Sequence, residues 1–131
     1  MEIHAAAAVE LSQDLHRVAV RNVAKARNSG ALRAPILVHH QDATEYELPK
    51  EPLVIYLFNP FGEKVILRVL DAIQSSLREA PRDAYVIYAN AIHRDCFDRS
   101  TCLQEIPRST WTKTLDRLMS RWPMAIYRAR A

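Results

Sequence analysis

The 131 residues are 49% hydrophobic and 25% charged, which is typical of one folded globular domain and excludes a disordered or fibrous chain. The formal net charge of +3 comes from the second half, where residues 66–131 hold eleven Lys/Arg against seven Asp/Glu. These basic residues form no run, so nucleic-acid binding is not indicated. The two glycines, Gly30 and Gly62, lie far apart, which excludes a G-x-G-x-x-G turn and a phosphate-binding P-loop from this sequence.

Strand-like and helix-like patterns alternate in the first half of the chain. Residues 1–8 look unlike a good strand, because alanine is a weak strand former. Apolar residues then recur at intervals of three and four, which predicts a helix over 12–27 with Ser12 as its N-cap. Apolar runs at 36–38 and 53–58 predict two strands. The second run is continuously apolar, as expected of a strand covered on both faces of a parallel sheet.

The second half continues this alternation. Apolar residues from Val65 to Leu77 recur with the helical period, and Ala80-Pro81 ends that helix. A mostly parallel α/β sheet flanked by helices, in a single domain over 1–131, follows from the whole pattern. The remaining elements expected are a buried strand over 84–88, a short helix around 93–97, a helix over 107–122 with Trp111, Leu115, Leu118 and Trp122 on its core face, and a strand over 124–127.

Polar residues follow four of the apolar runs. These residues are Glu10, Asp42, Asn59 and Asn90. Ligands of open parallel sheets bind just beyond the carboxyl ends of the strands, although Asp and Asn are also common there as turn formers. A carboxylate at a strand end accepts hydrogen bonds from ribose hydroxyls in dinucleotide-binding folds. We therefore favour a nucleoside ligand for Glu10 and Asp42, and consider a turn and a ligand equally for Asn59.

Four stretches carry a resemblance to a known family. They are VELSQDLHRVAVRNV (9–23), HQDAT (40–44), LVIYLFNPFG (53–62) and AYVIYANAIH (84–93). In this order, from Val9 to Asp98, they resemble the class I, Rossmann-fold S-adenosylmethionine-dependent methyltransferases, and in particular small bacterial members with an N-P-F motif. The ordered set carries the resemblance, rather than any single motif. It implies a transferase with S-adenosylmethionine as its cofactor and no metal.

The resemblance implies a role for individual residues of the cofactor site. Glu10 matches the acid that holds the ribose hydroxyls, and Leu11 matches its apolar neighbour, which packs on the adenine. Asp42 matches the acid that accepts the exocyclic amine of the adenine, and the backbone amide of Ala43 lies next to the ring.

A second group of residues matches the loop beside the transferable methyl group. By resemblance, Asn59, Pro60 and Phe61 lie next to the methyl group and its acceptor and are the catalytic candidates. Family members with an N-P-P-[YF] motif bind an acceptor amine there. This chain has N-P-F, so an amine is suggested and the acceptor is not identified.

The sequence also departs from the family. The glycine-rich turn that receives the methionine part of the cofactor is absent, together with the first strand and first helix, so the Rossmann-like fold is expected to be incomplete and the chain truncated. In the family this strand lies between the second and the fourth. Without it, either strands re-pair across the gap or sheet edges are exposed, and exposed edges invite pairing. The alternative function is therefore non-catalytic: a degenerate domain that acts as an interaction or assembly module, with a homodimer or a partner chain covering the open sheet.

Other residue patterns favour ordinary structural roles. His16 is expected on the polar, solvent-exposed side of its helix. His39 and His40 are adjacent and would point to opposite faces of a strand, so they are not expected to share a metal. His93, Cys96 and Cys102 are too loosely spaced to favour zinc over packing.

Two cysteines, no signal segment and no apolar run of membrane-spanning length predict a cytoplasmic protein with free thiols. A basic nucleic-acid-binding module is the third and weakest alternative.

Overall fold

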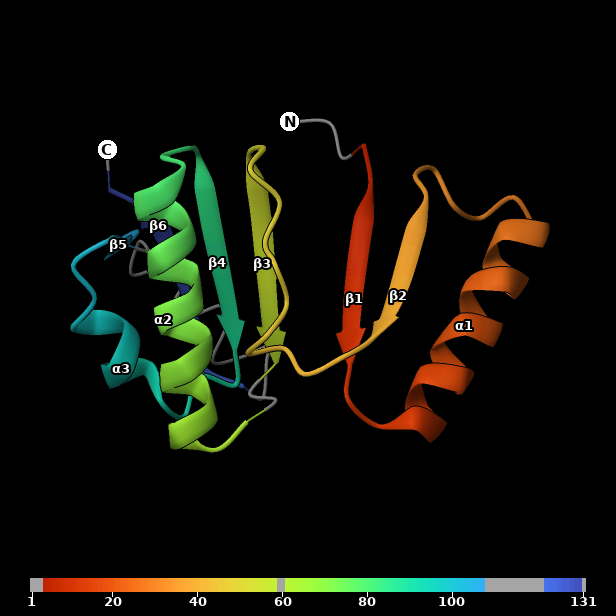
Figure 1. Cartoon of the computed structure of the whole chain (residues 1–131), viewed down its shortest axis with the longest axis horizontal. Helices are drawn as coiled ribbons and strands as arrows, with labels where there is room; N and C mark the ends of the chain where they lie inside the picture. Colours follow the sequence, from red (N-terminus) through yellow and green to blue (C-terminus); the bar gives the residue numbers. More distant parts are fainter. Residues whose placement is uncertain (1–3, 59–60, 108–121, 131) are drawn as a thin grey trace. The chain divides into compact units, whose positions relative to one another are not determined.

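The computed structural model describes residues 4–58, 61–107 and 122–130 (Figure 1). The chain divides into two compact units, Met1–Glu47 and Leu48–Ala131. Each unit contains a pair of parallel strands and at least one helix, which confirms the expected α/β class with a parallel-containing sheet flanked by helices. No helix in the described part of the chain is long and apolar enough to cross a membrane.

The first unit is a two-stranded parallel sheet with one helix. Strand β1 (Ala6–Glu10) pairs with β2 (Ile36–His40), from Ala6 opposite Ile36 to Glu10 opposite His40. The alanine-rich segment is therefore a strand, because the hydrogen bonds to β2 outweigh a weak local propensity. Helix α1 (Gln13–Asn28) begins after Ser12, whose Oγ accepts the amide of Leu15 at 3.4 Å. The predicted helix and its N-cap are confirmed.

No described residue of the first unit is buried, since every buried side chain lies at Leu57 or beyond. The face of α1 with the least exposure carries His16 and three small or β-branched residues, Ala19, Val23 and Ala26. Leu15, on another face of the same helix, is 58% exposed. A two-stranded sheet is marginal in water by itself, and this unit adds no core to support it.

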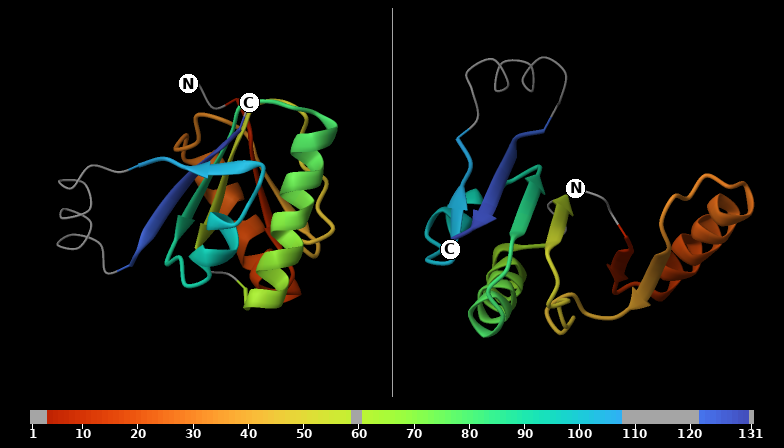
Figure 2. Two further views of the ribbon diagram at one scale, coloured as in Figure 1. Left: turned by 90° about the vertical axis from the view of Figure 1, so that its left-hand side faces the viewer. Right: turned by 90° about the horizontal axis from the view of Figure 1, so that it is seen from above.

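The second unit is a four-stranded mixed sheet in the order β3-β4-β6-β5 (Figure 2). β3 and β4 run parallel, whereas β6 is antiparallel to both β4 and β5. β5 was not predicted, because its three residues are too short to show a period. The elements are β3 (Leu53–Phe58), α2 (Glu63–Glu79), β4 (Ala84–Ala89), α3 (Arg94–Asp98), β5 (Leu103–Glu105) and β6 (Met124–Ala129).

The core of the second unit lies between α2, α3 and one face of the sheet. Tyr88, Phe97 and Tyr127 are fully buried, and the ring centroid of Phe97 lies 5.2 Å from that of Tyr88 and 5.3 Å from that of Tyr127. The predicted helix after Gly62 and the predicted buried strand after Asp83 are confirmed. Helix α2 leaves Val65 half-buried and buries the other five members of the apolar set identified from its period: Ile66, Val69, Leu70, Ile73 and Leu77.

Strand β3 is not covered on both faces, so that prediction is wrong. Leu57 is buried, but Val54, Tyr56 and Phe58 are 40%, 62% and 46% exposed. β3 is also an edge strand, with β4 as its one neighbour among the described residues. A continuous apolar run does not reveal whether both faces of a strand will be covered.

Part of the predicted helix over 107–122 lies outside the described residues, which include neither Trp111, Leu115 nor Leu118. Trp122 is described, and its indole is 46% exposed and packs edge-to-face on Phe58 with ring centroids 5.8 Å apart. Trp122 is therefore not the core residue that its helical spacing predicted.

Candidate functional site

The carboxyl ends of β1 and β2 lie side by side, because the two strands are parallel and in register. Glu10 is opposite His40, and the amide of Gln41 donates to the carbonyl of Glu10 at 3.1 Å. The structure thus brings together, at one end of one sheet, the four residues predicted to bind the cofactor: Glu10, Leu11, Asp42 and Ala43.

The Glu10 side chain caps the turn that follows β1. Its Oε1 accepts the amide of Ser12 at 2.7 Å, and the side chain is half-buried. A carboxylate has about four acceptor positions, so this bond leaves capacity to accept ligand hydroxyls. Leu11 is 67% exposed and offers an apolar surface next to Glu10.

The Asp42 side chain forms an Asx turn after β2. Its Oδ1 accepts both the amide and the hydroxyl of Thr44 at 2.8 Å, and Ala43 lies half-buried within the turn. Both acids therefore have the turn-forming role weighed from the sequence. Such bonds hold the acids in fixed orientations, and that is also what a ligand site requires.

Two histidines that the sequence reasoning did not place at this site bind the backbone near it. His40 Nε2 donates to the carbonyl of Leu11 at 2.9 Å, and His16 Nε2 donates to that of Val38 at 3.2 Å, with the two rings 5.4 Å apart. His16 is half-buried, so the prediction of an exposed His16 is wrong. The sequence does contain a signal for this burial, because His16 lies three residues before Ala19 and seven before Val23, on the inward side of α1.

The two histidines at the end of β2 each lie next to one other ring. His39 lies next to Tyr46, with ring centroids 5.3 Å apart, while His40 lies next to His16. Among the described residues, no three His, Cys, Asp or Glu side chains are grouped as a metal site would require. Burial raises the pKa of the Cys96 thiol, which makes it a poor nucleophile.

The predicted catalytic residues belong to the second unit. Asn59 and Pro60 lie outside the described residues. Phe61 is half-buried and precedes Gly62, the N-cap of α2. At the end of neighbouring β4, Asn90 adopts a left-handed φ of 51°, and its carbonyl accepts the amide of Ile92 at 2.8 Å.

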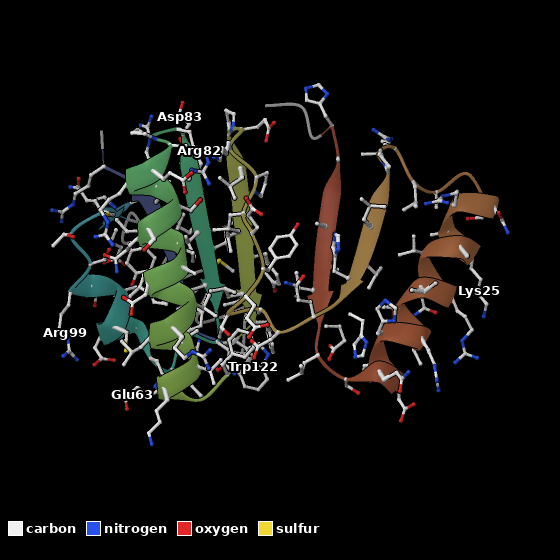
Figure 3. The ribbon with its side chains drawn as sticks, in the orientation of Figure 1. Lys25, Glu63, Arg82, Asp83, Arg99 and Trp122 are labelled. Atoms are coloured by element: carbon white, nitrogen blue, oxygen red, sulfur yellow. The ribbon has the colours of Figure 1, made fainter. Side chains whose placement is uncertain are left out.

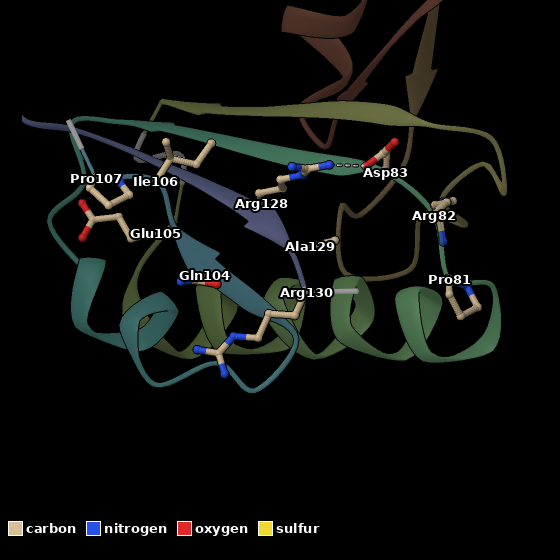
Figure 4. A pocket seen from close by; sticks show the side chains of 10 residues that line it. All are labelled: Pro81, Arg82, Asp83, Gln104, Glu105, Ile106, Pro107, Arg128, Ala129 and Arg130. Atoms are coloured by element: carbon tan, nitrogen blue, oxygen red, sulfur yellow. Dashed lines mark hydrogen bonds and ion pairs between the residues drawn. The ribbon is translucent and has the colours of Figure 1, made fainter. Parts of the chain in front are cut away.

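A groove of about 780 Å³ lies at the other end of the second sheet (Figure 4). It surrounds the ion pair between Arg128 and Asp83, whose atoms are 2.9 Å apart. Asp83 precedes β4, so the groove lies at the amino end of that strand. Figure 3 shows Arg82 and Asp83 at the opposite end of this unit from Glu63 and Trp122. Because parallel sheets bind ligands at their carboxyl ends, this groove is not the candidate site.

No protein-family model and no curated protein matches the sequence. The fold is shared with solved structures, among them the following two. One is the Haemophilus influenzae protein HI0767, a putative methylase, at 14% identity and a TM-score of 0.51, with 95% of this chain and 72% of that chain covered. The other is the 23S rRNA methyltransferase ErmE, at 16% identity and a TM-score of 0.53, with 95% and 52% covered. This chain thus spans about half the length of ErmE, and identities this low establish the fold alone.

Proposed function

We propose that the protein takes part in methyl transfer from S-adenosylmethionine. One observation carries the proposal: the parallel pairing of β1 and β2 sets Glu10 and Asp42 at adjacent carboxyl ends, each held by a backbone amide. Two such acids suit the ribose hydroxyls and the adenine amine of the cofactor. The shared fold with two proteins named as methylating enzymes supports the same reading.

The residues present fit the adenosine half of the cofactor. Glu10 would accept the ribose hydroxyls, Leu11 would cover the adenine, and Asp42 with the amide of Ala43 would bind the edge of the ring. The chain has two glycines and no glycine-rich turn for the methionine half. The fit therefore concerns nucleoside recognition, and nothing more is assigned to these four residues.

The bound cofactor would supply an activated methyl group on a sulfonium, so the protein's contribution is to position the acceptor and exclude water. Asn59, Pro60 and Phe61 are proposed to hold the acceptor. An amine acceptor is suggested by the N-P-F motif. We further infer a cytoplasmic location, supported by the free thiols of Cys96 and Cys102.

Isothermal titration of the full chain with S-adenosylmethionine tests this assignment. Glu10→Gln and Asp42→Asn keep an oxygen for the Ser12 and Thr44 amides but remove the negative charge. Each is expected to weaken binding about ten- to a hundredfold, the effect of losing one hydrogen bond to a charged group.

Glu47→Gln is the matched control, because it removes the same charge from an exposed position of the same unit. It is expected to leave the affinity unchanged. Unchanged affinity in both Glu10→Gln and Asp42→Asn, or equal weakening by Glu47→Gln, contradicts the assignment.

A second candidate function is a non-catalytic interaction or assembly module. The open strand edges favour it, since β1 and β3 each have one neighbour in the described sheets. A monomeric chain that binds S-adenosylmethionine at micromolar concentration would contradict this alternative.

A further inference from the structure

The edge of β3 that has no strand paired with it in the described sheet differs from most edges of this kind. Its six residues, LVIYLF, include no charge and no proline, whereas natural edge strands are usually blunted by charges, prolines or bulges. The opposite edge of the same sheet is protected: β5 has three residues, includes Glu105 and is followed by Pro107. An unprotected apolar edge on one side alone indicates a surface that is normally covered.

The residues of β3 alternate in the direction of their backbone N–H and C=O groups. The amide of Leu53 donates to the carbonyl of Asp83 at 3.1 Å. In a parallel ladder alternate residues face the same neighbour, so Leu53, Ile55 and Leu57 face β4. The N–H and C=O groups of the other three residues, Val54, Tyr56 and Phe58, are therefore directed to the open edge.

The sequence around β3 is symmetric about Tyr56. Pro52 and Pro60 lie four residues before and four residues after it. Proline has no N–H and ends strand pairing, so the pairable stretch has the same length on both sides of Tyr56. In an antiparallel pairing centred on Tyr56, Val54 of one copy meets Phe58 of the other, and every outward-facing residue meets an outward-facing residue.

We propose that β3 pairs antiparallel with β3 of a second copy of this chain, on a two-fold axis at Tyr56, and so joins the two four-stranded sheets. Three hydrogen-bonded residue pairs form: Tyr56 with Tyr56, and Val54 with Phe58 twice. The exposed side chains of these residues then pack across the junction as aromatic and β-branched pairs, which stabilise antiparallel sheets. No like charges oppose each other.

Self-complementarity favours a second copy over a different protein. A C2 dimer requires a surface that matches itself after a half-turn. Strand β3 meets that condition, because its flanking prolines are equally far from Tyr56 and it has no charge. Its three outward-directed residues also meet outward-directed residues of the second copy. The β1 edge lacks these properties, because it is alanine-rich and ends in Glu10.

Sedimentation of the full chain between about 1 and 100 µM tests the proposal, because weak dimers associate in this range. Tyr56→Lys removes an aromatic pair and places two like charges opposite each other on the axis, so it should raise the dimer dissociation constant about tenfold. Tyr56 is 62% exposed, so the monomer fold should persist, as circular dichroism will show.

Gln104→Lys is the control, since it adds the same charge to an exposed position on the opposite edge strand. It should leave the dimer intact. A monomeric wild-type chain, a dimer that tolerates Tyr56→Lys, or one that Gln104→Lys dissociates equally would overturn the proposal.

Disulfide trapping tests which residues of the two β3 strands lie opposite each other. In a Cys102→Ser background, Tyr56→Cys should form a covalent dimer, since the Cα atoms of a hydrogen-bonded pair lie about 5.5 Å apart and suit a disulfide. Val54→Cys should not, because its own equivalent lies about 13 Å away in this register. Trapping by Val54→Cys instead of Tyr56→Cys would refute the proposed axis. The readouts are independent of methyl transfer, so either proposal can fail without the other.

Discussion

The two units use the same elements with different results. Each contains a parallel strand pair and a helix with an apolar face, yet the first unit buries no described residue and the second contains the whole core. The inward positions of α1 include Ala19 and Ala26, whereas those of α2 include Ile66, Ile73 and Leu77. The helical period alone therefore does not make a core. The volume of the inward side chains and a sufficient number of strands decide it.

Hydrogen exchange should show the largest difference between the units. The Val69 amide of α2 is expected to exchange only through global unfolding, while the Val23 amide of α1 exchanges through local opening, at least about a hundredfold faster after correction for intrinsic rates. Both residues lie in helix interiors, so they are matched. Equal protection of Val23 and Val69, measured by NMR, would mean that the first unit is stabilised by contacts not seen within it.

Shortening an apolar side chain should lower the free energy of unfolding by a few kcal/mol more in the second unit than in the first. Ile73→Ala removes a side chain that is 2% exposed and should lower the free energy of unfolding by about 2–5 kcal/mol. Leu15→Ala, at an exposed position of α1, should change it by less than about 0.5 kcal/mol. Urea unfolding of both variants measures this. A loss of more than about 2 kcal/mol in Leu15→Ala would show that this surface is covered in solution.

Alkaline pH should produce a smaller effect that is specific to the second unit. Burial, together with the hydrogen bond to Asp98, raises the pKa of the Tyr127 phenol, and burial raises that of Tyr88. In the folded chain both phenols keep their protons above pH 10, the ordinary tyrosine value, while the unfolded chain loses them. The free energy of unfolding should therefore fall as pH rises above about 10.

The Tyr127→Phe variant tests whether the Tyr127 phenol causes part of this fall in the free energy of unfolding. It removes one of the two phenols, so the decline in unfolding free energy between about pH 9 and pH 11 should be shallower than in the wild type. Urea titrations at each pH provide the values. A wild-type stability that stays constant over this range, or an unchanged slope in Tyr127→Phe, would contradict the assigned cause.

Much of the fold was predictable because the helical period and apolar runs are strong local signals. Helix α2 followed from the spacing of its apolar residues, its end from Pro81, and the N-cap of α1 from the residue type of Ser12. The one-sided burial of β3 did not follow, because exposure of Tyr56 depends on which elements cover that face. β5 carried no period to detect.

The candidate site was predictable in position and less so in detail. The strand-end rule located Glu10 and Asp42, and the parallel pairing of β1 and β2 brings them together. The bonds from the Ser12 and Thr44 amides are ordinary turn chemistry; a turn role was expected from the residue types, but the donors were not. The backbone contacts of His16 and His40 depend on tertiary packing, so residue type alone did not reveal them.

The strand order of the second sheet has a consequence for folding kinetics. β5 joins the sheet only through β6, which follows it in the chain, and β6 also supplies Ala125 and Tyr127 to the centre of the core. The earlier elements therefore cannot complete their burial until β6 docks between β4 and β5. Such long-range pairing slows folding. During synthesis, β4 therefore lacks its second neighbouring strand, and the core lacks Ala125 and Tyr127, until β6 has left the ribosome.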